Sequence, residues 1–417
     1  MSLSCFELGE QMLSVDDARE ALMTLVEHPV GVEPIALSQA YGRRIASDII
    51  APINVPQHTN AAMDGIAMAW PSVQPHQTRW PIVGDAFAGQ AFEGNVPSGQ
   101  CVRITTGAPL PPGTDTVIMR EQLIEQGVSV MIDAPDRVSQ GQHVRQAGED
   151  IAIGEIALEA GTRLDAACLG LIASLGYGEV WVFRRPKVAI FSTGNEVTPP
   201  GDALPSAGIY DTNRFTLIGL LSEQGAEVMD LGILPDDPTT IQNALASAAK
   251  QCDLVITSGG VSVGHADYTR EALEALGQLA FWRVALRPGR PMACGWLGEA
   301  RKPFVGLPGN PVAVMVTFSQ FVVPLLQRLQ GQTPSPPRRL TAIAQTPLKS
   351  RLKRTDFIRG IYSSNAQGVL QVRSTGAQGS GILTSMVAAN CLIELGDHQE
   401  SAQPGEAVCI QPLTRWQ

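Results

Sequence analysis

Residues 253–268 read DLVITSGGVSVGHADY, and this stretch decides the fold class. DLVIT is a short apolar run rich in β-branched side chains, which is typical of a buried strand. The glycine-rich loop SGGVSVG follows it, and a helix is expected from Asp267 onward. A strand, a glycine loop and a helix in this order form the repeating unit of an α/β sheet.

Three further units of this kind occur in the same half of the chain. In each, an apolar run enters a turn-forming loop and then a helix: VAIF with STGNE (188–196), EVMDLGIL with PDDP (227–238), and FVGL with PGNP (304–311). Such repeats predict a central parallel sheet with helices on both faces. Because ligands bind at the carboxyl ends of such strands, the four loops should converge on one crevice.

The regions on either side of these α/β units have a different sequence pattern. Ser14 and Asp17 resemble a capping box and predict a helix near the N-terminus, and a second short helix is expected over 165–175. Residues 51–133 contain short β-type runs broken by Gly/Pro clusters, which predict a small β domain. After the linker TPSPPRR (333–339) short β runs return, so a C-terminal β domain is expected.

The bulk composition narrows the class of protein. With 417 residues, 44% hydrophobic and 17% charged, the chain should form several folded domains. A net charge of −10 argues against nucleic-acid binding. The seven cysteines form no CxxC pair, so neither a disulfide framework nor a zinc site is expected. The N-terminus does not resemble a signal peptide. The apolar run 311–326 is about one turn short of a membrane span and is interpreted as a buried helix. A cytoplasmic protein without a membrane contact is predicted.

Two segments can bind anions. In FWRVALRPGRP (281–291), strand alternation places Arg283 and Arg287 on one face, and Arg290 follows a Pro-Gly turn. The alternative is a solvated strand face. In the SGG loop, successive backbone N–H groups can form an anion-binding concavity, although a tight turn without a ligand would use the same residues.

Several motifs together resemble one family. SGGVSVGHADY with LPGNP is similar to the fold of molybdenum-cofactor biosynthesis proteins. The match narrows with five further motifs: NAAMDGIAM (60–68), RITTGAP (103–109), GED (148–150), IYDTN (209–213) and GAQGS (376–380). With these the chain resembles the bacterial molybdopterin molybdenumtransferases and the homologous domain of gephyrin.

The resemblance implies a fold and a reaction. The family forms elongated homodimers of four-domain subunits. The domains expected here are a helical N-terminal linking domain (1–53 and 143–181), an inserted β domain (54–142), the molybdopterin-binding α/β domain (182–334) and a C-terminal β domain (335–417). The implied reaction takes adenylylated molybdopterin and molybdate to the metal-loaded cofactor and AMP, assisted by Mg²⁺. The implied partners are the adenylyltransferase and downstream cofactor-handling proteins.

The same resemblance carries site residues over to this chain. Asp64, Glu196, Asp236 and Asp267 are expected to be catalytic, and the last three to hold magnesium. Taken alone, Asp267 could simply cap a helix, and Asp236 or Asp64 could set a turn. The substrate-binding set is expected to be Thr106, Arg145, Asp150, Ser258, Gly259, Gly260, Arg283, Arg287, Arg290, Pro308, Pro311, Arg354 and Ser380.

The chain departs from the family pattern at a few positions. Arginine stands at 283, 287 and 290 where lysine is frequent, Asn195 replaces a frequent aspartate, and Gly381 stands where histidine is common. Two other functions stay open: a related adenylyltransferase activity, and a non-catalytic scaffold. No Ser–His–Asp or Cys–His arrangement indicates covalent catalysis.

Overall fold

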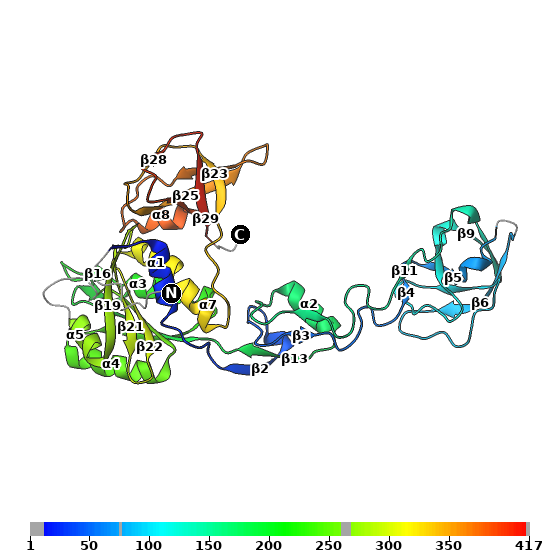
Figure 1. The fold of residues 1–417 in the computed structure, drawn as a ribbon, viewed down its shortest axis with the longest axis horizontal. Helices are drawn as coiled ribbons and strands as arrows, with labels where there is room; N and C mark the ends of the chain where they lie inside the picture. The colour runs from blue at the N-terminus through cyan, green and yellow to red at the C-terminus, as the bar shows by residue number, and fades with distance from the viewer. Residues whose placement is uncertain (1–11, 75–76, 260–267, 414–417) are drawn as a thin grey trace. The chain divides into compact units, whose positions relative to one another are not determined.

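The computed structural model describes residues 12–74, 77–259 and 268–413. The chain folds into two compact units (Figure 1). Unit 1 consists of the described residues within Met1–Glu33, Gly42–Ala46 and Val182–Gln417, and unit 2 consists of Pro34–Tyr41 and the described residues of Ser47–Trp181.

A seven-stranded sheet forms the centre of unit 1. Its order is β1 (Met12–Leu13), β19 (Gly277–Val284), β21 (Pro291–Leu297), β22 (Lys302–Leu307), β18 (Leu254–Ser258), β14 (Lys187–Thr193) and β17 (Glu227–Leu234). The expectation of a parallel sheet was only partly right, because β21 runs antiparallel to both β19 and β22. Short connections join β19, β21 and β22, and a short connection can join only antiparallel strands.

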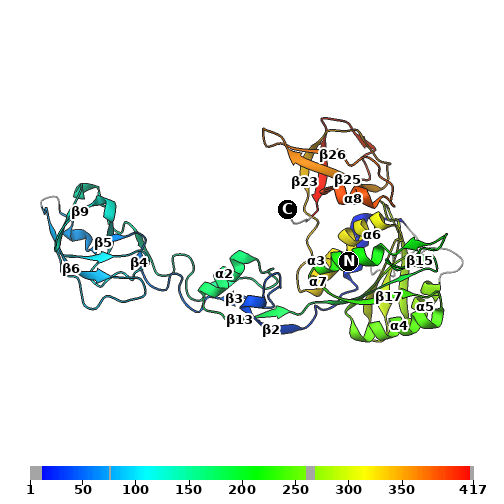
Figure 2. The ribbon, with the colours of Figure 1, turned by 180° about the vertical axis from the view of Figure 1, so that it is seen from behind.

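Helices cover both faces of this sheet, as Figure 2 shows from behind. Along β14, Val188 and Ile190 belong to one apolar core and Ala189 and Phe191 to the other. The first core also contains residues of α3 (Asn213–Glu223), α6 (Pro311–Thr317) and α7 (Val323–Leu329), and the second contains residues of α4 (Pro238–Gln251) and α5 (Tyr268–Leu276). A strand that is buried on both faces explains the continuous apolar runs in the sequence.

The helix from Pro311 to Leu329, which contains a π-turn at Phe318–Val322, is long and apolar enough to cross a membrane by composition alone. In the structure, 72% of its most apolar window is buried, as expected for a core helix. This agrees with the sequence-based interpretation of residues 311–326 as a buried helix.

The first helix, α1 (Val15–Met23), begins as the capping box predicts. The Oγ of Ser14 accepts a hydrogen bond from the backbone N of Asp17 at 3.1 Å. Its apolar face, including Leu22, joins the first core of unit 1. The predicted N-terminal domain is therefore not a helical one. Its other parts are mainly two-stranded ladders, β2 (Val32–Ala36) with β13 (Glu179–Phe183) and β3 (Ile49–Ile50) with β12 (Ile156–Leu158), beside one helix, α2 (Ala166–Ser174).

The remaining part of unit 2 is a small β domain, as its short β runs predict. Six strands pair in the order β8 (Thr116–Met119), β5 (Gly65–Met68), β7 (Cys101–Ile104), β6 (Trp80–Ala86), β10 (Ser129–Ile132) and β9 (Leu123–Gln126). Two apolar clusters fill the domain.

The C-terminal part of unit 1 is a β-barrel-like domain. Its strands pair in the order β20 (Leu286–Arg287), β25 (Thr355–Ser364), β26 (Leu370–Ser374), β23 (Leu340–Ala344), β29 (Ala407–Pro412) and β27 (Cys391–Leu395), and β27 pairs with β25 as well. The short helix α8 (Leu383–Ala388) lies between β26 and β27 in the chain. β20 comes from the α/β part of the chain, so the two parts of unit 1 share this sheet.

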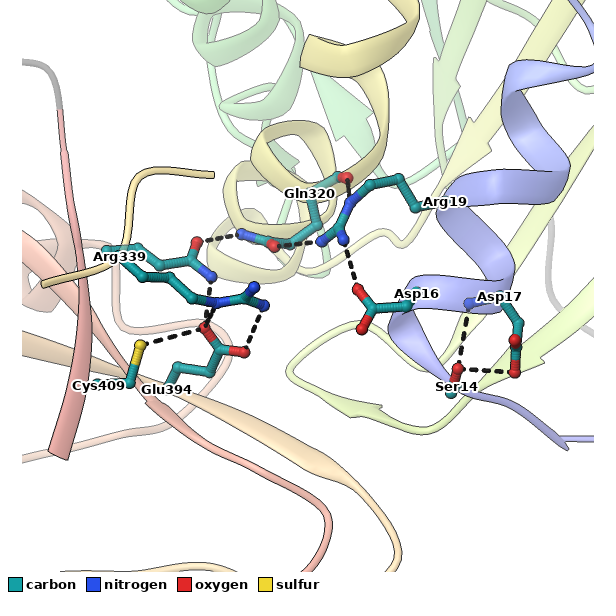
Figure 3. A network of polar contacts seen from close by, with 9 residues as sticks. Ser14, Asp16, Asp17, Arg19, Gln320, Arg339, Glu394 and Cys409 are labelled. Carbon is teal, nitrogen blue, oxygen red and sulfur yellow. Dashed lines mark hydrogen bonds and ion pairs between the residues drawn. The ribbon is translucent and has the colours of Figure 1, made fainter. Parts of the chain in front are cut away.

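A network of hydrogen bonds between polar side chains joins the same two parts (Figure 3). Arg19 on α1 donates to the backbone O and to the Oε1 of Gln320, at 3.1 Å each. Gln320 donates to Gln411 on β29 at 2.8 Å, and Gln411 donates to Glu394 on β27 at 2.8 Å. Arg339 closes the chain on Glu394 at 2.8 Å. Because each side chain in this network has a hydrogen-bond partner, the network holds the C-terminal barrel against the helix Pro311–Leu329, which contains Gln320.

Candidate functional site

The loops after β14 and β17 meet at the carboxyl edge of the sheet. The backbone N of Asn195 donates to the Oδ2 of Asp236 at 3.1 Å. Gly194 (φ 127°) gives the loop its tight path, because a Cβ there would lie 2.7 Å from a carboxylate oxygen of Glu196. The two predicted metal-binding acids, Glu196 and Asp236, therefore stand on adjoining loops, and Asn195 contributes its backbone.

The loop after β18 adjoins the loop after β22. The backbone N of Gly259 donates to the carbonyl of Leu307 at 3.1 Å, and a Cβ on Gly309 would lie 3.8 Å from the Cα of Gly259. The hydroxyl oxygen of Ser258 is buried and has no hydrogen-bond partner among the described residues. Two predicted site residues, Gly260 and Asp267, lie outside the described part of the chain.

The IYDTN motif ties these loops together. The buried carboxylate of Asp211 accepts a hydrogen bond from Ser192 at 3.0 Å and one from Arg214 at 2.8 Å. Asn213 donates to the carbonyl of Gly309 at 2.7 Å, while its own Oδ1 is buried without a partner in the described structure. The sequence identified this motif only through the family resemblance. The buried oxygens of Asn213 and Ser258, at the edge where the loops converge, have no partner among the described residues.

The basic segment lies beside this edge with the predicted alternation. Trp282, Val284 and Leu286 are buried, whereas Arg283 and Arg287 are exposed. The backbone N of Val284 donates to the carbonyl of Arg290 at 3.0 Å, which brings residue 290 back alongside residue 284. The guanidinium groups of Arg283, Arg287 and Arg290 are thus all attached to one short stretch of backbone.

The C-terminal barrel adds a further arginine that the sequence did not single out. Arg359 on β25 is 2% exposed and forms no ion pair within the described residues. Its guanidinium donates to Ser385 at 3.0 Å and to the carbonyl of Gly379 at 2.9 Å. Burial, and then the nearby charge of Arg287, lower the pKa of Arg359 to about 10, so it stays cationic at neutral pH. A lone arginine within the apolar strand TDFIRGIY was the available signal.

The loop that contains Gly379 and Ser380 also reaches the start of α6. The backbone N of Val312 donates to the carbonyl of Ser380 at 3.1 Å, so this loop satisfies a free N–H in the first turn of the helix. Pro308 and Pro311, both predicted site residues, flank the same loop-to-helix junction. Ser380 and Arg359 therefore lie next to the PGNP loop.

Arg354 is engaged within its own barrel. It lies before β25, and its Nη2 donates to the Oδ2 of the buried Asp356 at 3.1 Å. This guanidinium therefore already has a carboxylate partner inside the chain, and only 14% of its side chain is exposed.

Unit 2 holds the other predicted residues. The Oδ1 of Asp64 accepts hydrogen bonds from the backbone N of Thr106 at 2.7 Å and from its Oγ1 at 2.8 Å. These two bonds, the backbone one first, lower the pKa of Asp64, so its carboxylate is held ionised. Arg145 pairs across a short ladder with Asn60, and the backbone N of Asp150 donates to Val55. The hydrogen bonds between Asp64 and Thr106 thus join the MDG loop to the TTG loop within unit 2.

Three family models match the chain: the MoeA N-terminal region (domains I and II) over 13–176, a probable molybdopterin-binding domain over 189–328, and the MoeA C-terminal region (domain IV) over 341–413. A molybdopterin molybdenumtransferase of Haemophilus influenzae is 45% identical over 405 residues, which cover 96% of this chain and 99% of the relative. One from Nostoc is 33% identical over 96% of this chain and 94% of the relative. The crystal structure of a molybdopterin biosynthesis MoeA protein from Pyrococcus horikoshii matches 97% of this chain and 100% of its own, with 28% identity and a TM-score of 0.84.

Proposed function

The chain belongs to the molybdopterin molybdenumtransferase family, and from this premise we propose how its residues divide the work of inserting molybdenum into adenylylated molybdopterin with release of AMP. Its function is molybdenum transfer in molybdenum cofactor biosynthesis, which implies molybdate and adenylylated molybdopterin as substrates. The observation that carries the proposal is the convergence of four loops at one sheet edge, with buried oxygens there that have no hydrogen-bond partner among the described residues.

Magnesium would be held by Glu196 and Asp236, together with Asp267. The two described acids suit it, because magnesium takes one or two carboxylates and completes its octahedron with water and substrate phosphate oxygens. No group of three or more His, Cys, Asp or Glu side chains gathers for a metal among the described residues, and Asp267, the third proposed ligand, lies outside them. A bound Mg²⁺ would neutralise charge on the pyrophosphate of the substrate.

The anionic substrates would be held by cations and backbone donors. Arg283, Arg287 and Arg290 supply guanidinium groups from the α/β part, and Arg359 supplies one from the barrel. Arginine suits oxyanions because its planar fork can donate two parallel hydrogen bonds. The remaining proposed contacts come from Ser258, Gly259, Gly260, Pro308, Pro311 and Ser380.

Asp64 would act from unit 2. Thr106 keeps its carboxylate ionised and fixed, which suits a group that stabilises positive charge. Arg145 and Asp150 would contact substrate from the same unit. Covalent catalysis is not part of the proposal, since the dithiolene sulfurs that receive molybdenum belong to the substrate.

We also propose that the chain works as a cytoplasmic homodimer that contacts the adenylyltransferase and downstream cofactor-handling proteins. Support for self-association comes from unit 2, where Ile50 and Ile156 face each other across a ladder and both are exposed. Trp181 is exposed on the same unit. Exposed apolar side chains of this size are common at protein interfaces.

The magnesium role is tested by removing the metal. Purified protein treated with a chelator should lose AMP release, and added Mg²⁺ should restore it. In Glu196→Gln and Asp236→Asn variants, a higher Mg²⁺ concentration should be needed for half-maximal rate. A parental rate that is unchanged by chelation would refute the assignment of these acids to a metal.

A further inference from the structure

One buried carboxylate lies between the arginines of the α/β part and those of the barrel. Asp356 is 1% exposed and is the second residue of β25. Its Oδ2 lies 3.6 Å from the Nη1 of Arg287 and accepts a hydrogen bond from Arg354 at 3.1 Å. A third arginine, Arg359, stands three residues further along the same strand and carries no ion pair within the described residues.

The backbone fixes this arrangement. β20 and β25 run parallel, with Leu286 opposite Thr355 and Arg287 opposite Asp356. The backbone N of Thr355 donates to the carbonyl of Ala285 at 2.8 Å. The pairing of β20 with β25 therefore places the backbone of Arg287 directly beside that of Asp356.

The two arginines use Asp356 differently. Arg354 is held closely: besides the hydrogen bond to Oδ2, its Nε lies 2.8 Å from Oδ1, at an angle that does not make a hydrogen bond, so charge alone holds that contact. Arg287 is held loosely, because 3.6 Å is too long for a hydrogen bond, and half of its side chain is exposed. Arg287 therefore keeps its donors available for a ligand.

We propose that Asp356 is a positioning residue, which orients Arg287 toward the anionic substrate while Arg354 serves as the counterion of Asp356. This rests on the proposed anion-binding role of Arg287. It also gives Arg354 an indirect role, in place of the direct substrate contact that the family resemblance implied.

The physical reason is the local balance of charge. Three guanidinium groups near one another repel, and one carboxylate in a water-poor position offsets part of that repulsion. A long side chain that is already oriented loses less conformational freedom when it binds a ligand. Without Asp356, Arg287 would turn toward solvent, and binding would have to order it again.

The test is a double-mutant cycle on Asp356 and Arg287. AMP release is followed while molybdate and adenylylated molybdopterin are titrated separately against Asp356→Asn, Arg287→Ala and the double variant. Asp356→Asn should raise one of the two KM values about ten-fold with a smaller effect on kcat. In the Arg287→Ala background the same change should have little further effect on that KM. Asp356→Glu, which keeps the charge, should recover part of the loss.

The matched control is Asp253→Asn. Asp253 is also buried and is bound by both terminal nitrogens of Arg184, at 2.6 and 2.7 Å, but it precedes β18 at the opposite edge of the sheet. This variant should lose stability and keep both KM values. If Asp356→Asn does not fold, Arg354→Gln and Asp356→Glu carry the test, each with a raised KM.

Two results would overturn the proposal while the parent protein remains active. One is an Asp356→Asn effect on KM that is equally large with and without Arg287. The other is a loss of stability with both KM values unchanged. A parent that shows no molybdate-dependent AMP release would instead contradict the proposed function itself.

Discussion

Single residues at the sheet edge fall into two chemical groups. The acids Glu196 and Asp236 stand on loops joined by the Asn195 hydrogen bond, whereas Arg283 and Arg287 lie on β19 and β20. An acid that places a metal stabilises charge that develops during reaction, whereas a guanidinium that grips an oxyanion contributes already to substrate binding. The two groups should therefore respond differently to substitution.

The first prediction follows from this division. Asp236→Asn should lower kcat more than it changes either KM, while Arg283→Ala should mainly raise the KM of molybdate or of the adenylylated pterin. The loss of a charged hydrogen bond, about 1.5–3 kcal/mol, corresponds to roughly ten- to a hundred-fold in affinity. Arg283→Lys should be milder, since lysine keeps the charge. The opposite pattern, with normal turnover in Asp236→Asn and normal binding in Arg283→Ala, would reverse the roles.

Among single residues, the sequence predicted local features such as helix caps and strand alternation better than it predicted which side chains contact each other. The alternation in the basic segment and the caps at Ser14 and Asp237 follow from short-range rules, and the structure has them. The sequence did not single out Arg359, nor the link between Arg354 and Asp356. Arg359 donates to Ser385 and Gly379 in a later segment, and the Arg354–Asp356 pair lies beside Arg287 only because β25 pairs with β20, a register that no local pattern encodes.

The pairing of β5 with β8 determines the position of Asp64 in unit 2. Gly65 follows Asp64 directly and opens β5, and a Cβ at this position would overlap the backbone carbonyl of Ile118 on β8. The close approach of two strands explains why the MDG motif needs glycine. It also links the stability of the sheet to the position of the Asp64 carboxylate.

We therefore expect Gly65→Ala to lower both the melting temperature of unit 2 and the turnover, because β5 must move away from β8. The matched control is Gly170→Ala in α2, where no atom lies within 4 Å of the added Cβ. That change should stabilise the helix by about 0.5–1 kcal/mol and leave turnover unchanged. A Gly65→Ala protein with parental melting and turnover would show that the strands can separate at no cost.

The network in Figure 3 makes a prediction about pH. Burial opposes ionisation of Glu394, but hydrogen bonds from Arg339 and Gln411 outweigh it and lower its pKa. A carboxyl with a lowered folded-state pKa contributes stability above its unfolded pKa, and that stability is lost as pH falls through the folded pKa. Glu394→Gln should therefore destabilise the protein by about 1–3 kcal/mol at neutral pH and by less in acid.

Thermal unfolding of parent and variant at about pH 7 and about pH 3.5 checks this. Glu227→Gln, which removes the exposed partner of Lys187, is the control and should change stability by no more than about 0.5 kcal/mol at either pH. A Glu394→Gln deficit that is as large in acid as at neutral pH would mean that the carboxylate charge is not what the network uses.

At this scale the sequence predicted the strand–loop–helix units well but not the whole sheet. Helices α4 and α6 begin where the PDDP and PGNP loops predict, at Pro238 and Pro311, because caps and prolines are local signals. The antiparallel strand β21 and the ladders of the N-terminal region were missed. Both depend on which strands meet across the fold, and the N-terminal ladders have only two to five residues on each strand.

For the whole molecule, the acids that we propose to be catalytic are divided between two compact units: Asp64 lies in unit 2, and Glu196 and Asp236 lie in unit 1. If the active site is shared across a homodimer, inactive Asp64→Ala and inactive Asp236→Ala proteins should complement each other after subunit exchange. Random exchange gives roughly a quarter of the parental activity, since half of the dimers are mixed and each holds one intact site. Mixtures that stay inactive after proven exchange would place the complete site within one chain.

The most direct test of the central claim measures AMP release from adenylylated molybdopterin by the purified protein, with and without molybdate. The account predicts release that depends on molybdate, saturates with it, and is accompanied by metal-loaded molybdopterin in equal amount. AMP release that proceeds equally well without molybdate, or molybdate-saturated protein that leaves adenylylated molybdopterin intact, would contradict it.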